Sequence, residues 1–424
     1  MVRKTVAGIL PDQWEGRLIK DVSKVVRGSS PRPAGDPRYF NGDYLPWVTV
    51  ADVTGDQSMY LDSTKTCLTS EGAEKTRVTE PGTLMLTNSG ATLGVPKISR
   101  IKSGANDGIA MLLNLRGIIS EFAYYYLASK TDFFRDVLAP GVGQPNLNTE
   151  LIGDFPIPVP PLPEQKKIAQ ILSTWDQAIT ATERLLENSQ QRKKGLMQQL
   201  LTGKKRLVEN ETQLTLKKTR TGDIPGDWEY PKIAEVCSQI TDKNSDDHRY
   251  PVLACSKHYG FVDSLSYFKK RVYSEDLTGY RIIPRGCIGF PANHVEEGSI
   301  GLQNLYDFGL VSPIYVVARP NSKKVNADYL YAVLKTDHYR QIFSAATNAS
   351  VDRRGSLRWK EFSQIRIPLP PLAEQNKIAE FLKLATSGID VLETDLELLR
   401  QEKRALMQQL LTGKRRVRVD TEAA

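Results

Sequence analysis

Three short stretches contain residue types that metal or cofactor sites use, but none has the spacing such a site requires. Cys255 and His258 form one C-x-x-H pair, whereas zinc needs four ligands, or three and a water. "GVGQPN" (141–146) lacks the third glycine of a dinucleotide loop, and "TGKK" (202–205) lacks the spacing of a P-loop. The four histidines all lie in the second half. We therefore predict no catalytic residue, no metal site and no cofactor in this chain.

The remaining chemistry is polar and basic, and it lies in loops. Arg, Lys, Asn, Gln and Ser are the residue types that contact base edges and phosphates of duplex DNA. The net charge of +8 agrees with a polyanionic partner. The candidate DNA-contacting residues are Arg27, Ser29, Ser30, Arg32, Thr87, Asn88, Ser89, Lys97, Gln144, Asn146, Asn148, Lys243, Asn244, Lys257, Tyr259, Asn293, His294, Asn348, Arg353, Arg354 and Arg358.

An internal repeat must position these loops. "LMQQLLTGK" occurs at 196–204 and again at 406–414, and "PPLPEQKKIAQIL" from Pro160 matches "PPLAEQNKIAEFL" from Pro370. Both pairs are 210 residues apart, far beyond the period of a solenoid. The repeat predicts two globular domains (1–155 and 208–364) alternating with two helices (156–207 and 365–424), one framework with two different surfaces.

Each repeated helix has the four-three spacing of a coiled-coil seam. Prolines precede each start, and Gly203 and Gly413 follow the last leucines as C-caps. The seam contains Leu172, Ile179, Leu186, Leu196 and Leu200 in the first helix and Leu382, Ile389, Leu396, Leu406 and Leu410 in the second. Each helix spans about 40 residues, roughly 60 Å.

The two helices should pack on each other, because each alone would expose a leucine stripe. Antiparallel packing is favoured, because the chain runs along one helix to the second domain and returns along the other. That arrangement relates the two halves by a pseudo-twofold axis. Lys193 and Lys403 fall at the seam's far ends, where we expect their ammonium groups to reach solvent. The alternative, in which each helix pairs with another chain, stays open. Without an apolar run of membrane length or a secretory signal, we expect a cytoplasmic protein with no membrane partner.

The globular parts are predicted to be mixed α/β, so the fold class is α+β. Residues 45–53, 82–88, 109–116 and 309–319 have the β-branched content of strands. Residues 120–138 and 327–343 are expected to form helices whose tyrosines pack in the core rather than stack on nucleic acid.

The sequence resembles the specificity (S) subunit of type I restriction–modification systems. The resemblance covers essentially the whole chain and rests on "IPVPPLPEQKKIA" with "IPLPPLAEQNKIA", the doubled "LMQQLLTGK", and the paired "GQPNLNTELIGDFPIP" and "GSLRWKEFSQIRIP". It implies two target-recognition domains that each read half of a split DNA sequence, with the helices fixing the gap.

The resemblance also implies partners. Two methyltransferase (M) subunits dock on the helices, and restriction (R) subunits join them. Catalysis, with S-adenosylmethionine, ATP and Mg²⁺, then belongs to those subunits. The residues carried over as subunit contacts are Pro160–Leu162, Glu164, Gln165, Lys167 and Ile168 with Pro370–Leu372, Glu374, Gln375, Lys377 and Ile378. The alternatives are a single-chain methyltransferase or nuclease, and a coiled-coil scaffold without a DNA role.

Overall fold

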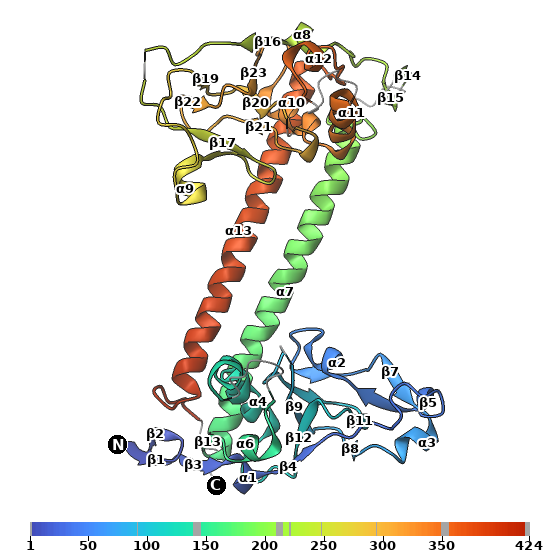
Figure 1. Ribbon diagram of the computed structural model, residues 1–424, viewed down its shortest axis with the longest axis vertical. Coiled ribbons are helices and arrows are strands. Elements are labelled where there is room, and N and C mark those ends of the chain that lie inside the picture. The colour runs from blue at the N-terminus through green and yellow to red at the C-terminus, as the bar shows by residue number, and fades with distance from the viewer. Residues whose placement is uncertain are drawn as a thin grey trace. The chain divides into compact units, whose positions relative to one another are not determined.

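The computed structural model describes residues 2–90, 92–138, 146–208, 215–219, 222–246, 248–293, 295–348 and 356–419. The chain divides into two compact units (Figure 1). Unit 1 comprises Met1–Arg184 and Thr394–Ala424, and unit 2 comprises Leu185–Glu393. Each unit therefore contains one globular domain and a part of both long helices. Among the helices that the structure describes, none is long and apolar enough to cross a membrane.

The two predicted long helices are present as α7 (Leu162–Leu201) and α13 (Leu372–Leu410). Their contacts run antiparallel inside each unit. In unit 1, Glu183 accepts from Arg400 and Asp176 pairs with Lys403. In unit 2, Gln190 donates to Glu393 and Lys193 donates to Thr386. In both sets the residue number rises along one helix as it falls along the other, as the antiparallel prediction requires.

Burial along the two helices agrees with the predicted seam. All ten seam residues are buried or half-buried, and most residues between them are exposed. The expectation for the two seam lysines is wrong. Lys403 is only 21% exposed and pairs with Asp176, while the Lys193 ammonium lies 2.7 Å from the Thr386 hydroxyl. Each ammonium binds a partner on the opposite helix, and both side chains are half-buried.

The domain of unit 1 is built on two sheets. One has the strand order β4-β12-β9-β10-β6 and the other β7-β5-β11-β8, and the hairpin β1-β2 and the pair β13-β3 lie apart from them. The strands are β1 Val2–Thr5, β2 Gly8–Pro11, β3 Glu15–Leu18, β4 Lys24–Arg27, β5 Phe40–Val48, β6 Tyr60–Leu61, β7 Thr66–Leu68, β8 Val78–Thr79, β9 Leu84–Thr87, β10 Pro96–Ser99, β11 Ser103–Ala105, β12 Ile109–Leu113 and β13 Pro156–Val159. The helices are α1 Ile19–Val22, α2 Val50–Thr54, α3 Ser70–Ala73, α4 Ser120–Ala128, α5 Thr131–Phe133, the π-helix Phe134–Leu138 and α6 Thr149–Gly153.

The central strands of unit 1 are buried on both faces, so they contain runs of apolar residues rather than an alternating pattern. Leu84 and Leu86 of β9 face the core that contains α4 and the start of α7. Met85, between them, faces a second core with Val48 of β5 and Val53 of α2.

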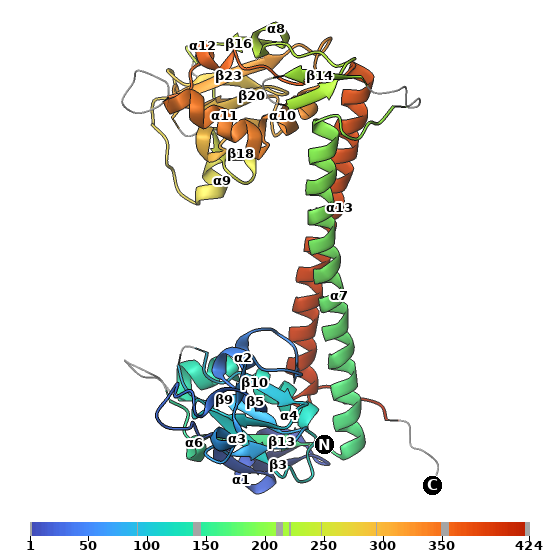
Figure 2. The ribbon, with the colours of Figure 1, turned by 90° about the vertical axis from the view of Figure 1, so that its right-hand side faces the viewer.

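The domain of unit 2 has the same two-faced plan. Its main sheet has the order β16-β23-β20-β21. Three separate two-stranded sheets, β17-β18, β19-β22 and β14-β15, form the rest of its β-structure. Helices α10 and α11 lie on one face of the main sheet (Figure 2). The strands are β14 Leu216–Thr219, β15 Gly222–Pro225, β16 Cys237–Ile240, β17 Leu253–Ser256, β18 Gly260–Asp263, β19 Arg281–Pro284, β20 Ile288–Pro291, β21 Gly301–Leu302, β22 Phe308–Val311 and β23 Tyr315–Pro320. The helices are α8 Ile233–Val236, α9 Ser264–Phe268, the 3-10 helix Val295–Glu297, α10 Ala327–Leu334, α11 Asp337–Asn348 and α12 Trp359–Phe362.

Several shorter predictions need correction at their boundaries. Residues 45–53 are a strand that ends at Val48 and a helix that starts at Val50, because Thr49 caps that helix by accepting from Asp52 N. Residues 309–319 are two strands, separated by a turn in which Tyr315 N donates to Ser312 O. Both predicted tyrosine-rich helices break at a Lys-Thr-Asp sequence, between α4 and α5 and between α10 and α11. Their tyrosines Tyr125 and Tyr329 are buried, as predicted.

Candidate nucleic-acid interface

The two copies of the repeated helix are joined to the domains by matching buried clusters. In unit 1, Glu164 at the start of α7 accepts from the Trp14 indole (3.2 Å) and from Arg416 (2.8 Å). In unit 2, Glu374 at the start of α13 accepts from the Trp228 indole (3.2 Å) and from Arg206 (2.7 Å). We call each trio a Trp-Glu-Arg latch. Each latch joins the start of one helix, the tail of the other and a domain.

A buried glutamine beside each latch anchors the domain to its helix. Gln165 donates to the carbonyls of Pro160 and Gly117 and accepts from Ile119 N, each at 2.8 Å. Gln375 repeats this pattern with Pro370, Lys324 and Asn326. Each amide therefore uses both of its hydrogens and its oxygen within its own unit.

The repeated "LMQQLLTGK" ending docks each helix on a hairpin. Gly203, after α7, has φ +71° and lies so close to Pro225 that a Cβ would meet its ring at 2.4 Å. Gly413, after α13, has the same φ and approaches Pro11 as closely. Only glycine fits such a left-handed, crowded position without strain. The duplicated sequence thus reproduces one docking contact in each unit.

These contacts change the interpretation of the predicted subunit-contact residues. The side chains of Glu164, Gln165, Ile168, Glu374, Gln375 and Ile378 are buried inside their own units. The expectation that they contact another subunit is therefore wrong for the folded chain: they position the recognition domains. Lys167 and Lys377 are exposed.

In the first domain, the predicted residues Arg27, Ser30 and Arg32 meet around Asp107. The Ser30 hydroxyl donates to the Asp107 carboxylate, Arg32 pairs with it at 3.0 Å, and Arg27 donates to the Asp107 carbonyl. The hydrogen bond from Ser30 and the two guanidinium charges hold the pKa of the Asp107 carboxyl below its usual range. This exposed edge therefore presents an ordered array of donors with one acceptor among them.

A hollow of about 420 Å³ lies beside that array. Ser30, Arg32 and Asp107 line one part of it, and Phe40 and Trp47, in edge-to-face contact at 5.0 Å, line another. The Trp47 indole N–H is buried without a hydrogen-bond partner within the described residues. Trp47 and Asp107 were not predicted, because their positions beside the Arg27–Arg32 loop depend on sheet pairing.

For three other candidates of the first domain, the prediction that they lie at the surface is wrong. Thr87 and Asn88 are buried, and Lys97 is buried with its ammonium against the carboxylate and carbonyl of Asp56. Two more have structural partners: Ser89 forms a β-bridge with Asn146, and Asn148 caps α6 by accepting from Leu151 N. The Ser29 hydroxyl accepts from Arg77 N.

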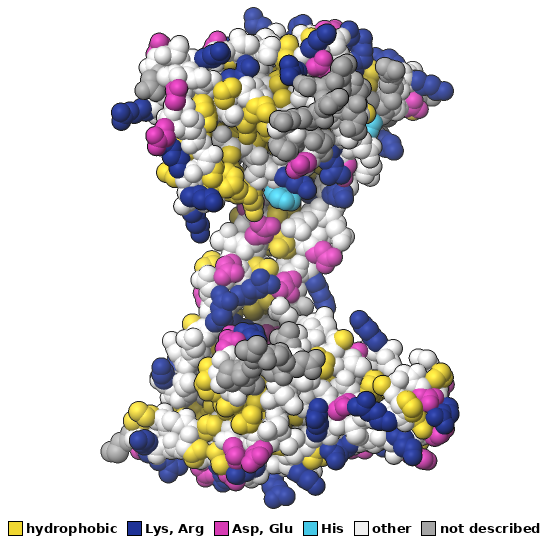
Figure 3. Space-filling view, in the orientation of Figure 1, with side chains coloured by type: hydrophobic (Ala, Val, Ile, Leu, Met, Phe, Trp, Pro, Cys, Tyr) yellow, Lys and Arg dark blue, Asp and Glu magenta, His cyan; other side chains and the backbone are white. Residues whose placement is uncertain are grey.

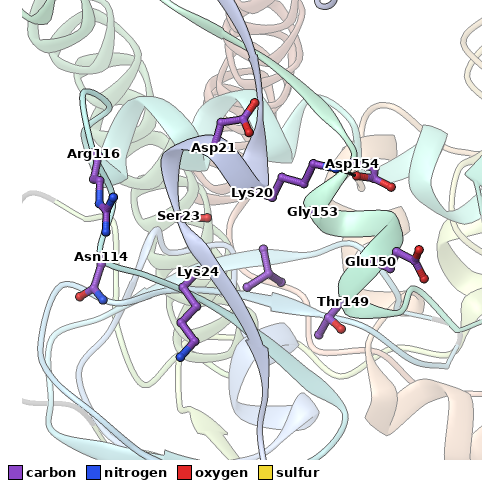
Figure 4. A pocket seen from close by; sticks show the side chains of 11 residues that line it. Lys20, Asp21, Ser23, Lys24, Asn114, Arg116, Thr149, Glu150, Gly153 and Asp154 are labelled. Atoms are coloured by element: carbon purple, nitrogen blue, oxygen red, sulfur yellow. Dashed lines mark hydrogen bonds and ion pairs between the residues drawn. The ribbon is translucent and has the colours of Figure 1, made fainter.

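A second hollow, of about 510 Å³, belongs to the framework. Figure 4 shows it lined by side chains from α1, β4 and α6, with Lys20 reaching Asp154 at 2.6 Å. Unit 2 contains a similar contact made from a different position: Lys232, the residue before α8, donates to Gln364 at 2.7 Å. Because a lysine joins the same two parts of the framework in both units, we assign this hollow to domain assembly rather than to recognition.

In the second domain, Lys243, Lys257, Tyr259 and Arg358 are exposed, whereas Asn293 is half-buried. The prediction for Asn244 as a surface residue is wrong. Its buried amide donates to the carbonyls of His248 and Leu277 and so closes the loop. Gln144, His294, Arg353, Arg354 and the Asn348 side chain lie outside the described residues.

The second domain also exposes aromatic rings that the prediction covered only in part. Tyr259 follows β17, and Tyr267 and Phe268 end α9. We call these three residues the α9 aromatic patch. The signal was present in the sequence as "SYFKKRVY", an aromatic pair followed by cations.

The four cysteines are free thiols, and Cys237 and Cys287 are buried. Within the described ranges, no group of three or more His, Cys, Asp or Glu residues is placed to hold a metal. Burial raises the pKa of the Cys237 and Cys255 thiols to about 12, so both are protonated at neutral pH.

Comparison with known proteins places this architecture in a family. The family model described as "Type I restriction modification DNA specificity domain" matches twice, at residues 11–188 and 225–401. The MjaVIII type I restriction enzyme specificity subunit of Methanocaldococcus jannaschii is 26% identical, over 96% of this chain and 94% of that protein. The putative MjaX specificity subunit of that organism is also 26% identical, over 98% and 97%.

Solved structures share the fold. The S subunit of a type I restriction–modification system from M. genitalium superposes with a TM-score of 0.56 at 15% identity, covering 94% of this chain and 96% of that one. A chain from a study of complex assembly and conformational transition in the type I R-M system gives 0.55 at 16% identity, covering 96% and 99%. Both likenesses support the duplicated α+β fold.

Proposed function

Because this chain belongs to the type I restriction–modification DNA specificity family, a non-catalytic class, we propose that it reads a bipartite target in duplex DNA. Each domain contacts one half of the target. The first uses the edge formed by Arg27, Ser30 and Arg32, and the second uses the surface around Lys257 and Tyr259. Phosphate contacts supply most of the affinity, and base-edge contacts supply the sequence preference.

One observation carries this proposal: the same latch holds two domains with different surfaces. The framework contacts repeat almost atom for atom, from the Trp-Glu-Arg latches to the glutamine anchors. The exposed residues do not repeat, since the first domain presents an Arg-Ser-Asp array and the second presents aromatic rings beside lysines. Two unlike surfaces on one framework suit a target with two unlike halves.

The spacing between the halves is assigned to α7 and α13, because each is continuous from one unit into the other. We propose that M subunits, which carry S-adenosylmethionine, and R subunits, which use ATP and Mg²⁺, assemble on this chain. Because Glu164, Gln165 and their repeats are buried, we place the docking surface on the exposed faces of the helices.

A domain exchange tests the proposal. The chain is co-expressed with its M subunits, and methylated adenines are mapped genome-wide. Residues 19–155 are then replaced by the corresponding segment of a relative with another target, which leaves both latches intact. We expect one half of the methylated sequence to change while the other half and the spacing stay. An unchanged sequence contradicts the proposal, and S-adenosylmethionine binding to the isolated chain would favour an enzyme instead.

A further inference from the structure

The α9 aromatic patch is a contiguous exposed surface. Tyr259 is 74% exposed, Tyr267 46% and Phe268 43%. The ring centroids of Tyr259 and Tyr267 lie 6.4 Å apart, and those of Tyr267 and Phe268 lie 5.0 Å apart, both edge to face. Contiguous aromatic exposure of this kind marks a binding surface.

The turn that carries Tyr259 is held rigidly. The Ser256 hydroxyl accepts from the backbone N–H of His258 (3.3 Å) and of Tyr259 (3.4 Å). From beneath, the Lys335 ammonium donates to the carbonyls of Lys257 and Gly298, both at 2.8 Å. Because this ammonium binds backbone carbonyls of two segments, it holds the turn in place against the rest of the domain.

The residues after the turn are equally constrained. Gly260 has φ +67°, and a Cβ there would meet the Tyr331 hydroxyl at 2.9 Å. Asp263 caps α9 by accepting from Ser266 N at 2.9 Å, and Lys269 ends it in the left-handed conformation at φ +54°. The rings therefore project from a fixed base.

Cations surround the patch. Lys257, Lys269 and Lys270 make no ion pair within the described residues, whereas the adjacent Arg271 is shared between Glu275 and the Tyr273 ring. Figure 3 shows hydrophobic side chains gathered over the α9 region with Lys and Arg at their edge. The surface thus combines flat apolar rings with unpaired positive charge.

We propose that the α9 aromatic patch packs against nucleobases at a distorted base step in the half-site of the second domain, while Lys257, Lys269 and Lys270 contact the flanking phosphates. This inference rests on the proposed DNA-reading function. Duplex DNA offers both complements together, base faces at an opened step and phosphates on either side. Opening a step costs a few kcal/mol, so the inserting ring must be rigid. The braced turn satisfies that requirement.

The test uses the full chain assembled with its M subunits and a duplex carrying the mapped target. Binding is measured by fluorescence anisotropy over a salt series, and 2-aminopurine replaces single bases across the second half-site. With wild type we expect 2-aminopurine fluorescence to rise at the one base step that the patch opens. Tyr259→Ala should abolish that rise and weaken binding roughly 5- to 100-fold, without changing the salt slope. Tyr259→Phe keeps the ring and should bind like wild type.

Two further variants separate the components of the surface. Lys269→Gln/Lys270→Gln should lower the salt slope by roughly 0.9 for each phosphate that the variant no longer neutralises. Tyr44→Ala removes a tyrosine that is 67% exposed in the first domain beside Asp43, and should leave the fluorescence signal unchanged.

The outcomes are distinct. If wild type binds its target and Tyr259→Ala binds equally well, the inference is overturned while the proposed function stands. If Tyr259→Ala loses M-subunit assembly but the assembled fraction binds DNA normally, the patch is a protein-docking surface and the inference is again overturned. If wild-type complex does not bind DNA, both proposals fail.

Discussion

At the scale of single residues, the most repeated part of the sequence turns out to be internal. The Glu-Gln pair of each "PEQ" or "AEQ" sequence is buried in the latch and the anchor, so its duplication records a structural need. The repeated Glu-Gln pair is evident in the sequence, but the sequence does not reveal whether its glutamate is buried or exposed. The partner arginines Arg206 and Arg416 lie beyond the repeated "LMQQLLTGK" and are distant in sequence from Glu374 and Glu164, so only the fold shows the pairing.

The latches give a graded prediction for stability. Glu374→Gln removes the buried carboxylate of Arg206, which is 7% exposed and keeps only its pair with the half-exposed Asp227, so we expect a loss of roughly 1.5–3 kcal/mol in the free energy of unfolding. Glu164→Gln should cost less, because Arg416 is 37% exposed and is partly solvated. Glu183→Gln breaks the exposed pair with Arg400 and should cost at most about 1 kcal/mol. Urea unfolding measures all three, and equal losses would contradict the assignment.

The two thiols with a raised pKa give a prediction for the pH dependence of stability. The pKa of Cys237 and Cys255 is about 12 in the folded chain, above the roughly 8.5 of a thiol in an unfolded chain. Their contribution to stability is therefore complete below about pH 8.5 and is lost as the pH rises toward 12. At pH 8 we expect iodoacetamide to label both cysteines far more slowly than in urea, with labelling followed by mass spectrometry. Rapid labelling of the native chain at either cysteine is the contrary result.

At the scale of elements, periodicity predicted the long helices well because burial along the middle of α7 and α13 follows the seam. The shorter elements were harder to delimit. The helix boundaries at Thr49 and near Thr336 depend on threonine side chains that accept backbone hydrogens, a choice that propensity does not reveal. The buried strands carry apolar residues on both faces, which hides their alternation. The base-contact candidates Thr87 and Asn244 were misjudged because a polar side chain can close a neighbouring turn: Thr87 accepts from Val95 N, and Asn244 donates to His248 O. Lys97 lies in β10, where only the fold brings it to Asp56, and Asn88 is buried directly after the end of β9.

The seam gives a matched pair of substitutions on one helix. Leu396 is 7% exposed, whereas Leu398, two residues along α13, is 51% exposed. Leu396→Asp buries a charge against α7, so we expect a loss of several kcal/mol in the free energy of unfolding and impaired assembly with M subunits. Leu398→Asp makes the same replacement at an exposed position of the same helix, so it should change the free energy of unfolding by about 0.5 kcal/mol or less. Circular dichroism during thermal unfolding compares them, and equal midpoints for the two variants would show that the seam is misassigned.

At the scale of the whole molecule, each unit contains its own latch, anchor and cores. This organisation predicts that damage stays local. In hydrogen-exchange mass spectrometry, Glu374→Gln should speed exchange in β14, β15 and the segment after α7, while peptides around Trp14 keep the protection of wild type. Glu164→Gln should give the reverse pattern. Faster exchange throughout both units in either variant would mean that the chain unfolds as one cooperative body.

The division into units also has a consequence for synthesis. Unit 2 is one continuous stretch, but unit 1 needs the segment from Thr394 onward. A ribosome finishes every residue of unit 2 before that segment emerges. Until then Glu164 lacks Arg416, and the apolar face of α7 near Ile168 and Leu172 lacks its partners Leu410 and Leu411. The first-made half of the nascent polypeptide thus keeps part of its apolar surface uncovered until translation ends, and surface of this kind is what makes folding intermediates prone to aggregate.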